Sequence, residues 1–289
     1  HESQMKLKLL TILAALFCVA ASCTASFDVA DSPVDYVSTL VGSMSKHSIS
    51  TGNTYPAIAR PWGMNFWTPM TGTMGDGWTY TYTADQIRGF KQTHQPSPWI
   101  NDYGQFALMP VTVGEVFDQD ARASWFSHKA ETAKPYYYSV YLADHDVYTE
   151  LTVTERAAAF RLTYPERERS YLVIDAFDND SWVKVIPEKN MIVGYTTKNS
   201  GGVPDNFRNW FVVVCDTPFD YVRTVSDGRN MSESLSSESF HSGALVGFKT
   251  VRGQKVGLRV ASSFISLEQA ERNLAELGDG DFDRLVEEG

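Results

Sequence analysis

Cysteine is scarce in this chain of 289 residues, which contains only three. Three cysteines are too few for a disulfide framework, even in an oxidising compartment, and no spacing of cysteines or histidines matches a metal site. Cys215 follows three valines, and its position is compatible either with a small buried hydrophobic side chain or with a reactive thiol. The sequence therefore offers no candidate metal ligands and no disulfide scaffold.

A long hydrophobic run is also absent. The apolar stretch Leu9–Val19 follows Lys6 and Lys8, and its length of about eleven residues is too short to span a bilayer. With the small residues that come after it, this arrangement is typical of a secretory signal. We predict that residues 1–22 are a signal peptide and that the protein is exported.

The end of this signal resembles a bacterial lipobox, because Cys23 stands directly after Ala-Ala-Ser. In a lipobox that cysteine is acylated and becomes the new N-terminus, although Ala20 stands here in place of the usual leucine. The alternatives are a lipoprotein with a tether over residues 23–34, or plain secretion. Both place the protein at the bacterial cell envelope, with membrane contact only through the lipid anchor.

Positive charge is in short supply, since 25 Lys and Arg face 35 Asp and Glu, for a net charge of −10. Glu2 against Lys6 and Lys8 leaves +1 within residues 1–22, so the remainder carries −11. Nucleic-acid binding depends on Lys and Arg neutralising phosphates, and this surface disfavours it. Neutral ligands such as sugars are compatible with such a surface.

Helical periodicity is rare before about residue 265, and short strand patterns separated by turn clusters dominate. Thr79, Thr81 and Thr83 alternate with aromatic residues, which predicts a strand over 78–83 with two different faces. Further strands are expected at 106–113, 136–143, 147–154, 157–164, 171–177, 191–197, 210–215, 244–250 and 256–264. This pattern predicts a mainly β fold, a large antiparallel β-sandwich over residues 35–265.

The organisation changes at Ser266. Ser266 and Gln269 fit a capping box, and apolar residues follow at helical spacing. A second short helix begins near Phe282. Helices this short are marginal alone, so residues 266–289 need a surface on which to pack, and we predict that they start a helical linker.

The segment Gly89–Gly104 combines rings, amides and a carboxylate with two prolines that precede Trp99. An indole face beside paired hydrogen-bonding groups suits a sugar, whose ring offers C–H faces and hydroxyl edges. The two prolines stiffen the approach to Trp99 and lower the entropy lost on binding. We predict a sugar-binding loop here; a loop whose tryptophan covers a sheet edge is the alternative.

A series of short motifs in this order resembles glycoside hydrolase family 92, the calcium-dependent exo-acting α-mannosidases. The motifs are Gly52-Asn53, Arg60-Pro61-Trp62-Gly63-Met64, Gly89-Phe90, Thr93-His94, Asp102-Tyr103-Gly104, Met109-Pro110, Glu268-Gln269-Ala270 and Asp281-Phe282-Asp283. The resemblance runs from about Asp35 to the last residue. It implies a supersandwich-like N-terminal domain, α-mannoside glycans as ligands, and calcium as the cofactor of the full-length enzyme.

In the family, a larger (α/α)6 barrel follows the sandwich and supplies the general acid, the general base and most calcium ligands. The resemblance therefore implies no catalytic acid or base in this chain, and a C-terminal catalytic domain as its partner. The loop from Lys91 to Asp102 is most similar to members that cleave α-1,2-linked mannose. In those members the tryptophan at the position of Trp99 contacts the leaving-group sugar.

The candidate substrate-binding residues each have a structural alternative. His94 either donates to a sugar oxygen or is held by a neighbour, Asp102 either binds hydroxyls or caps the loop, and Trp78 is either a pocket floor or core. The residue set is Gly52, Asn53, Trp78, His94, Gln95, Trp99, Asn101 and Asp102. Asn206-Phe207-Arg208 either lines the cleft or clamps the following domain, and Asp76 and Glu115 are expected to be ordinary solvated acids.

Two functions fit these patterns. The first is the sugar-binding N-terminal half of an α-1,2-mannosidase that removes terminal mannose from mannan or high-mannose N-glycans with inversion. The second is a stand-alone carbohydrate-binding envelope lipoprotein without catalytic activity. Further codons that encode helices with paired carboxylates would favour the first.

Overall fold

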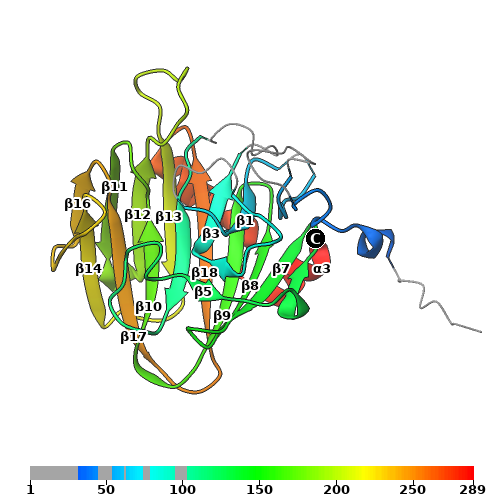
Figure 1. The fold of residues 1–289 in the computed structure, drawn as a ribbon. Coiled ribbons are helices and arrows are strands. Elements are labelled where there is room, and N and C mark those ends of the chain that lie inside the picture. Colours follow the sequence, from blue (N-terminus) through cyan, green and yellow to red (C-terminus); the bar gives the residue numbers. More distant parts are fainter. Residues whose placement is uncertain (1–31, 45–53, 62, 74–78, 95–102) are drawn as a thin grey trace, which may run out of the picture. The chain divides into compact units, whose positions relative to one another are not determined.

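The computed structural model describes residues 32–44, 54–61, 63–73, 79–94 and 103–289. The chain divides into two units, residues 1–36 and Val37–Gly289. In the first, Pro33–Tyr36 forms the short 3-10 helix η1. The second unit is mainly antiparallel β structure with a short helical segment at its end, which confirms the predicted fold class (Figure 1).

Two large sheets form the sandwich. In spatial order, the seven-stranded sheet contains β1 (Phe66–Met70), β3 (Gly89–Thr93), β4 (Ala107–Val111), β10 (Arg167–Asp175), β17 (Gly243–Thr250), β14 (Tyr221–Ser226) and β15 (Asn230–Ser232). The nine-stranded sheet contains β16 (Ser236–Ser239), β11 (Ser181–Ile186), β12 (Met191–Thr196), β13 (Asn209–Cys215), β18 (Gln254–Ser263), β9 (Ala157–Tyr164), β8 (Val147–Val153), β7 (Tyr137–Leu142) and β6 (Glu131–Ala133). A two-stranded sheet pairs β2 (Gln86–Ile87) with β5 (Ser124–Trp125).

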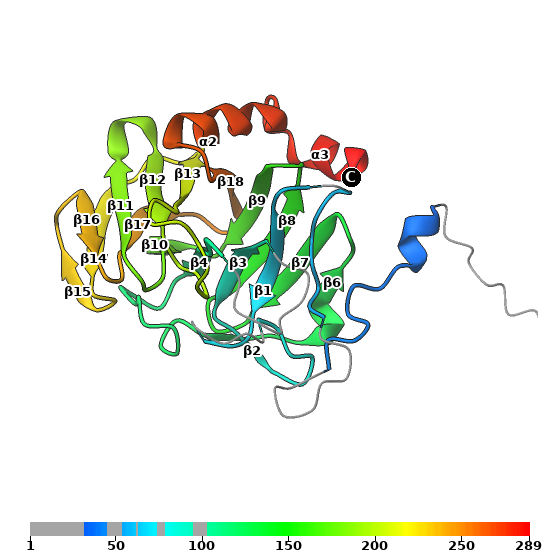
Figure 2. The same cartoon turned by 90° about the horizontal axis from the view of Figure 1, so that it is seen from above.

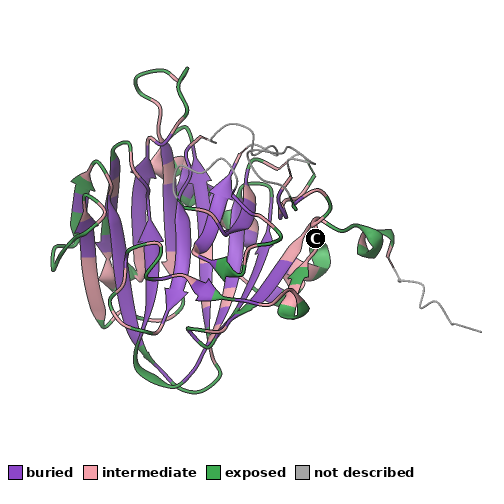
Figure 3. Ribbon diagram, in the orientation of Figure 1, coloured by how far each residue is buried: buried purple, intermediate pink, exposed green. Residues whose placement is uncertain are grey.

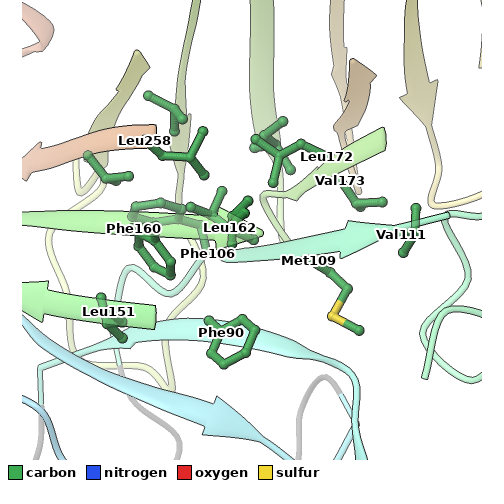
Figure 4. Close-up of a cluster of buried hydrophobic side chains, with 14 of the residues drawn as sticks. Phe90, Phe106, Met109, Val111, Leu151, Phe160, Leu162, Leu172, Val173 and Leu258 are labelled. Atoms are coloured by element: carbon green, nitrogen blue, oxygen red, sulfur yellow. The ribbon is translucent and has the colours of Figure 1, made fainter. Parts of the chain in front are cut away.

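The main core contains apolar side chains from both large sheets (Figure 4). The strands of both sheets are mostly buried (Figure 3). At its centre, Trp67 makes edge-on contacts with Phe106 and Phe160, with ring centroids 5.5 and 5.1 Å apart. Phe106 also stacks on Phe211 at 4.4 Å. Such aromatic pairs contribute about 0.5–1.5 kcal/mol each beyond their buried area, so this group joins β1, β4, β9 and β13.

Most predicted strands are confirmed, with shifts of a few residues at their ends. The strand β9 spans Ala157–Tyr164 as predicted. Cys215 is 2% exposed in the core, where burial raises the pKa of its thiol to about 12. The interpretation of Cys215 as a small buried hydrophobic side chain is therefore confirmed. Strands β1, β11 and β14 were not predicted, and Pro69 inside β1 obscured the first of them.

The strand predicted over 78–83 is wrong for the described residues 79–83, which form an irregular segment and a turn. Their backbone bonds to the neighbouring segment instead of entering a ladder. Thr79 O accepts from Thr71 N at 2.9 Å, and Thr71 Oγ1 accepts from Thr81 N at 2.9 Å. Thr79 and Tyr80 are both buried, so the alternation in sequence does not mark two faces.

The first part of the predicted sugar loop is also wrong as a loop. Gly89–Thr93 is the strand β3, and all five of its residues are buried, including Lys91 at 2% exposure. It pairs with β1 on one side and β4 on the other. Polar side chains in this strand are buried because groups from distant parts of the chain bind them, as described below.

The helical end begins as predicted. Ser266 Oγ accepts from Gln269 N at 3.1 Å and caps α2 (Leu267–Asn273), whereas the Gln269 side chain donates to Asn273 instead of returning to Ser266. The 3-10 turn η4 (Leu274–Leu277) and the helix α3 (Phe282–Glu288) follow. Short 3-10 turns also occur at η2 (His128–Ala130) and η3 (Pro187–Lys189). Within the described ranges, no helix is long and apolar enough to cross a bilayer.

These helices lie on the outer face of the nine-stranded sheet (Figure 2). Leu277 and Leu285 are fully buried there against small residues of β9 and β18, such as Ala159 and Ala261. Arg161 of β9 binds Glu150 with two hydrogen bonds and stacks 4.4 Å over the ring of Phe282. The apolar stripe of the helical end is thus covered by this sheet.

Candidate functional site

Of the eight side chains predicted to bind sugar, the structure describes one, His94. The other seven and the predicted lipidation site lie outside the described residues: Gly52, Asn53, Trp78, Gln95, Trp99, Asn101, Asp102 and Cys23. The candidate site is therefore built from the described residues on either side of the predicted loop. Strand β3 ends there at Thr93, and the described chain resumes at Tyr103.

Three polar side chains from different strands meet at this end of the sandwich. Gln92 of β3 donates from Nε2 to Ser262 Oγ of β18 at 2.9 Å. Asn209, at the start of β13, donates from Nδ2 to Gln92 Oε1 at 3.1 Å and to Gly104 O at 2.6 Å. Because all three side chains are buried, these bonds satisfy groups that would otherwise be costly.

Gly104 closes the described part of the loop in a conformation that only glycine adopts easily. Its φ is 66°, and an added Cβ would lie 2.5 Å from Asn209 Cβ and 2.9 Å from Phe264 Cε1. Its amide donates to Lys198 O at 2.7 Å. The return of the loop is therefore fixed against both β13 and the end of β12.

His94 is held by residues that follow the loop in sequence. Its Nδ1 lies 2.7 Å from the carbonyl oxygen of Tyr103, and because a carbonyl only accepts, we assign the proton to Nδ1. The imidazole also packs 4.8 Å from the ring of Phe264. Of the two interpretations of His94, the described contacts with a carbonyl and a ring support a residue held by its neighbours.

Aromatic rings surround His94. Phe264 lies 5.5 Å from Phe207, and Phe207 lies 6.4 Å from Tyr103. With the amides described above, they form what we call the loop-base cluster: Gln92, His94, Tyr103, Phe207, Asn209 and Phe264. Phe207 thus faces the cluster, whereas its neighbour Arg208 turns to Tyr195, 4.9 Å from that ring.

A pocket of about 410 Å³ opens beside Phe264, and we call it the Phe264 pocket. Its rim is apolar and exposed, with Met64 at 60%, Phe264 at 41% and Ile265 at 79% exposure. Its described lining is completed by Arg156, Ser262, Ser263, Gln269 and Asn273. No Asp or Glu is among these lining residues, so they contain no pair of carboxyl groups for hydrolysis.

The polar groups of the Phe264 pocket are largely bonded to one another. Asn273 donates to Ser262 O at 2.8 Å and accepts from Gln269 Nε2 at 2.9 Å. The guanidinium of Arg156 is paired with Glu276. What remains open to a ligand is mainly apolar surface, which suits the C–H face of a sugar or a protein contact.

A strained turn and an ion pair adjoin the loop-base cluster, and sequence reasoning missed both. Lys198, whose carbonyl holds Gly104, pairs with Asp178 at 2.6 Å. Phe177, Asn179 and Asp180 all have positive φ, at 60°, 78° and 64°. The Asn and Asp run predicted a turn, but nothing in sequence marked the strain at Phe177, which costs about 1–3 kcal/mol.

The remaining candidates are placed as follows. Asp76 lies outside the described residues, and Glu115 lies on the surface, 3.9 Å from Arg223. Among the residues that the structure describes, no group of three or more His, Cys, Asp or Glu side chains could hold a metal ion.

Comparison with known proteins gives a consistent result. The model of the glycosyl hydrolase family 92 N-terminal domain matches residues 36–263. A family 92 inverting mannosidase from Bacteroides thetaiotaomicron is 43% identical in sequence, with a TM-score of 0.85 over 88% of this chain and 35% of that chain.

A second family 92 α-mannosidase from the same organism is 27% identical, with a TM-score of 0.78 over 88% of this chain and 36% of that chain. It has also been solved in complex with mannoimidazole. The present chain thus spans about a third of the length of these enzymes. No curated protein matches the chain significantly.

Proposed function

Because the chain belongs to glycosyl hydrolase family 92, whose N-terminal domain matches residues 36–263, we propose that it is the sugar-binding half of an exo-acting α-mannosidase. The family match carries this proposal. The related structures support it, since they are mannosidases and one was solved with mannoimidazole. The loop-base cluster and the Phe264 pocket supply the rings and amides that a sugar site needs.

The general acid and base belong, in this proposal, to a following (α/α)6 domain. Inverting hydrolysis uses two carboxyl groups about 6.5–9.5 Å apart, and the described lining of the Phe264 pocket contains none. The 289-residue chain should release no mannose from α-1,2-mannobiose, whereas a longer form with the following domain should do so. Turnover by the 289-residue chain alone would contradict the assignment of the general acid and base to the following domain.

Calcium is proposed as the cofactor of that longer form, on the strength of the family resemblance. Since the described residues hold no metal cluster, we assign the ligands to other parts of the protein and no chemical step to the ion. A chelator should abolish activity of the longer form, and added calcium should restore it. Activity that survives chelation would remove calcium from the proposal.

The proposed substrate is terminal α-1,2-linked mannose on mannan or high-mannose N-glycans, released with inversion. The likeness of the segment from Lys91 to Asp102 supports the linkage, and the related inverting mannosidase supports the stereochemistry. Proton NMR of the first product anomer tests inversion: the β-anomer should appear first. An initial α-anomer would indicate retention.

Trp99 is proposed to stack on the leaving-group sugar. An indole in that role contributes on the order of 1–3 kcal/mol. Trp99→Ala in the longer form should lower kcat/KM for α-1,2-mannobiose by about 5- to 150-fold, and much less for an activated aryl mannoside. Trp125→Ala, at an exposed position on β5, is the matched control. Equal losses on both substrates with a lower Tm would assign Trp99 to the core.

Export to the cell envelope with acylation at Cys23 completes the proposal. Cys23→Ala should move the protein from the membrane fraction to the soluble fraction of its native host. An unmodified N-terminus, found by mass spectrometry of the native protein, would indicate plain secretion. The alternative of a stand-alone binding lipoprotein is not favoured, because the related structures are mannosidases.

A further inference from the structure

Three aromatic side chains stand in a row on the outer face of the nine-stranded sheet. Trp182 of β11 lies opposite Tyr195 of β12, and Tyr195 lies opposite Trp210 of β13. The ring centroids are 5.9 Å apart for the first pair and 5.0 Å for the second. Alternate residues such as Val183 and Phe211 face the core, so the row faces outward. We call these three residues the aromatic row.

The row lies at the border of the helix-covered area. Trp182 and Trp210 pack against the cluster that α2 and α3 make with the sheet, yet each keeps part of its surface accessible. The helices run over β13 and β18 and leave β11 and β16 uncovered (Figure 2). One side of the row is therefore anchored by packing, and the other side is open.

Polar groups border the row, and Tyr195 at its centre is only 9% exposed, so the accessible ring surface belongs to Trp182 and Trp210. Trp182 Nε1 donates to Ser236 Oγ at 3.0 Å, and the Tyr195 hydroxyl donates to Glu238 Oε1 at 2.6 Å, both on the edge strand β16. Arg208 lies 4.9 Å over the Tyr195 ring. Ser236 and Glu238 are exposed, and Glu238 pairs with Trp182 in the strand register, so a hydroxyl and a carboxylate border the accessible indole of Trp182.

We propose that the aromatic row is a surface binding site for a neutral oligosaccharide. A sugar ring places its C–H face on an indole and its hydroxyls against charged side chains at the ring edge, and this arrangement provides both. An apolar peptide or helix would instead desolvate the charged groups of Glu238 and Arg208 and offer them no new polar partner. The assignment of the sugar as mannose rests on the proposed function; the assignment as a glycan site does not.

The loop-base cluster and the aromatic row are joined by one dipeptide. Phe207 contacts Phe264 in the cluster, and Arg208 borders the row. The connection between β12 and β13, which carries both residues, projects beyond the end of the sheet (Figure 1). A glycan chain with one end near the loop-base cluster could thus be held a second time on the row, which would retain a polymeric substrate.

Affinity electrophoresis tests the proposal with the 289-residue chain. Gels containing soluble α-mannan should slow the wild-type chain, and gels with dextran serve for comparison. Trp182→Ala should raise the Kd for α-mannan about tenfold, or about 1.4 kcal/mol. Trp125→Ala, which removes another exposed tryptophan on β5, should leave the Kd unchanged. Glu238→Gln, a milder change on an exposed residue, should raise the Kd several-fold without altering the fold.

The outcomes separate this site from the proposed function. No retardation of the wild-type chain by either polymer, or equal retardation of wild type and both row variants, would overturn the proposal. Retardation by dextran alone, lost in Trp182→Ala, would uphold the glycan site and count against mannose as its sugar. Failure of the longer form to release mannose would contradict the mannosidase assignment without affecting this binding measurement.

Discussion

Two buried carboxylates in the sandwich are neutralised in different ways. Asp175, at the end of β10, binds the guanidinium of Arg122 at 2.8 Å and His241 Nε2 at 2.7 Å. Glu131, at the start of β6, accepts from the hydroxyls of Tyr138 and Tyr80 at 2.6 and 3.1 Å. Asp175 is thus paired with a guanidinium that stays charged at every accessible pH, whereas Glu131 accepts mainly from neutral hydroxyl donors.

A histidine completes the Glu131 network. His128 Nδ1 lies 2.6 Å from Glu131 Oε2, and its Nε2 lies 2.6 Å from the carbonyl oxygen of Tyr82. The imidazole ring also stacks on the ring of Tyr82. Both ring nitrogens of His128 thus face oxygen acceptors, a carboxylate and a carbonyl. The network thereby fixes the segment around Tyr80 and Tyr82, where the predicted strand failed to form.

The Asp175 network fixes a different segment. Asp175 Oδ1 also accepts from Phe177 N at 3.0 Å, the first residue of the strained turn beside the loop-base cluster. Burial alone raises the pKa of Asp175, but Arg122, His241 and this amide together hold it well below the usual range. Each buried carboxylate thus binds an irregular segment of the chain: Asp175 holds the turn at Phe177, and Glu131 holds the segment around Tyr80.

The largest expected effect comes from removing the permanent cation. Arg122→Met leaves Asp175 buried without its main partner and should lower the free energy of unfolding by about 3–5 kcal/mol, measured by urea denaturation. Lys249→Ala, which breaks the exposed pair with Glu168, is the control and should cost about 0–1 kcal/mol. Similar losses for the two variants would mean that Asp175 is adequately solvated without Arg122.

The pH dependence should show the two networks at opposite ends of the scale. Because the pKa of Asp175 is lowered in the folded state, its contribution is present above about pH 4 and is lost as pH falls further. Burial, and then the charge of Glu131, raise the pKa of Tyr80 and Tyr138, so their contribution is present below about pH 10 and is lost above it.

Tm measured from pH 2 to 12 follows both the loss of stability at low pH, the acid limb, and the loss at high pH, the alkaline limb. Tyr138→Phe should flatten the alkaline limb and leave the acid limb unchanged. An alkaline limb that is the same in this variant would show that other groups cause it.

These networks also explain what could and could not be predicted from sequence. Strand β9 was visible because its pattern is local, whereas β3 was mistaken for a loop because its polar residues are buried by partners far along the chain. Gln92 bonds to Ser262, and Arg122 bonds to Asp175. No window of sequence contains both partners, so polarity near Gln92 predicted solvent exposure.

The site was less predictable than the fold for a related reason. Family motifs pointed to the region around His94, and the described part of that region does contain rings, amides and a pocket. Two of its exposed contributors, Phe264 and Ile265, follow the last strand and were interpreted as a strand end before a helix. Their role depends on Phe207 and His94 lying beside them, which is a property of the folded chain.

A smaller effect than that of Arg122→Met is expected at Glu131. Glu131→Gln keeps the shape of the side chain but replaces one carboxylate oxygen by an amide NH2. That NH2 group faces one of the present donors, Tyr80, Tyr138 or His128, and leaves it without an acceptor. The loss should be about 1–3 kcal/mol in urea denaturation. Recovery of stability by combining Glu131→Gln with His128→Gln would show that the His128 side chain is the group left unpaired. If Glu131→Gln costs as much as Arg122→Met, the contrast between the two networks fails.

The smallest effects should come from single hydroxyls in the Glu131 network. Tyr80→Phe and Tyr138→Phe each remove one donor and retain the ring, and a typical hydrogen bond of this kind contributes about 0.5–1.5 kcal/mol. Tyr138 should cost more than Tyr80, because its hydroxyl is closer to Glu131, at 2.6 Å against 3.1 Å. A double-mutant cycle with Glu131→Gln measures the coupling. Coupling near zero for both would mean that the rings alone stabilise this region, and that Glu131 is held by His128.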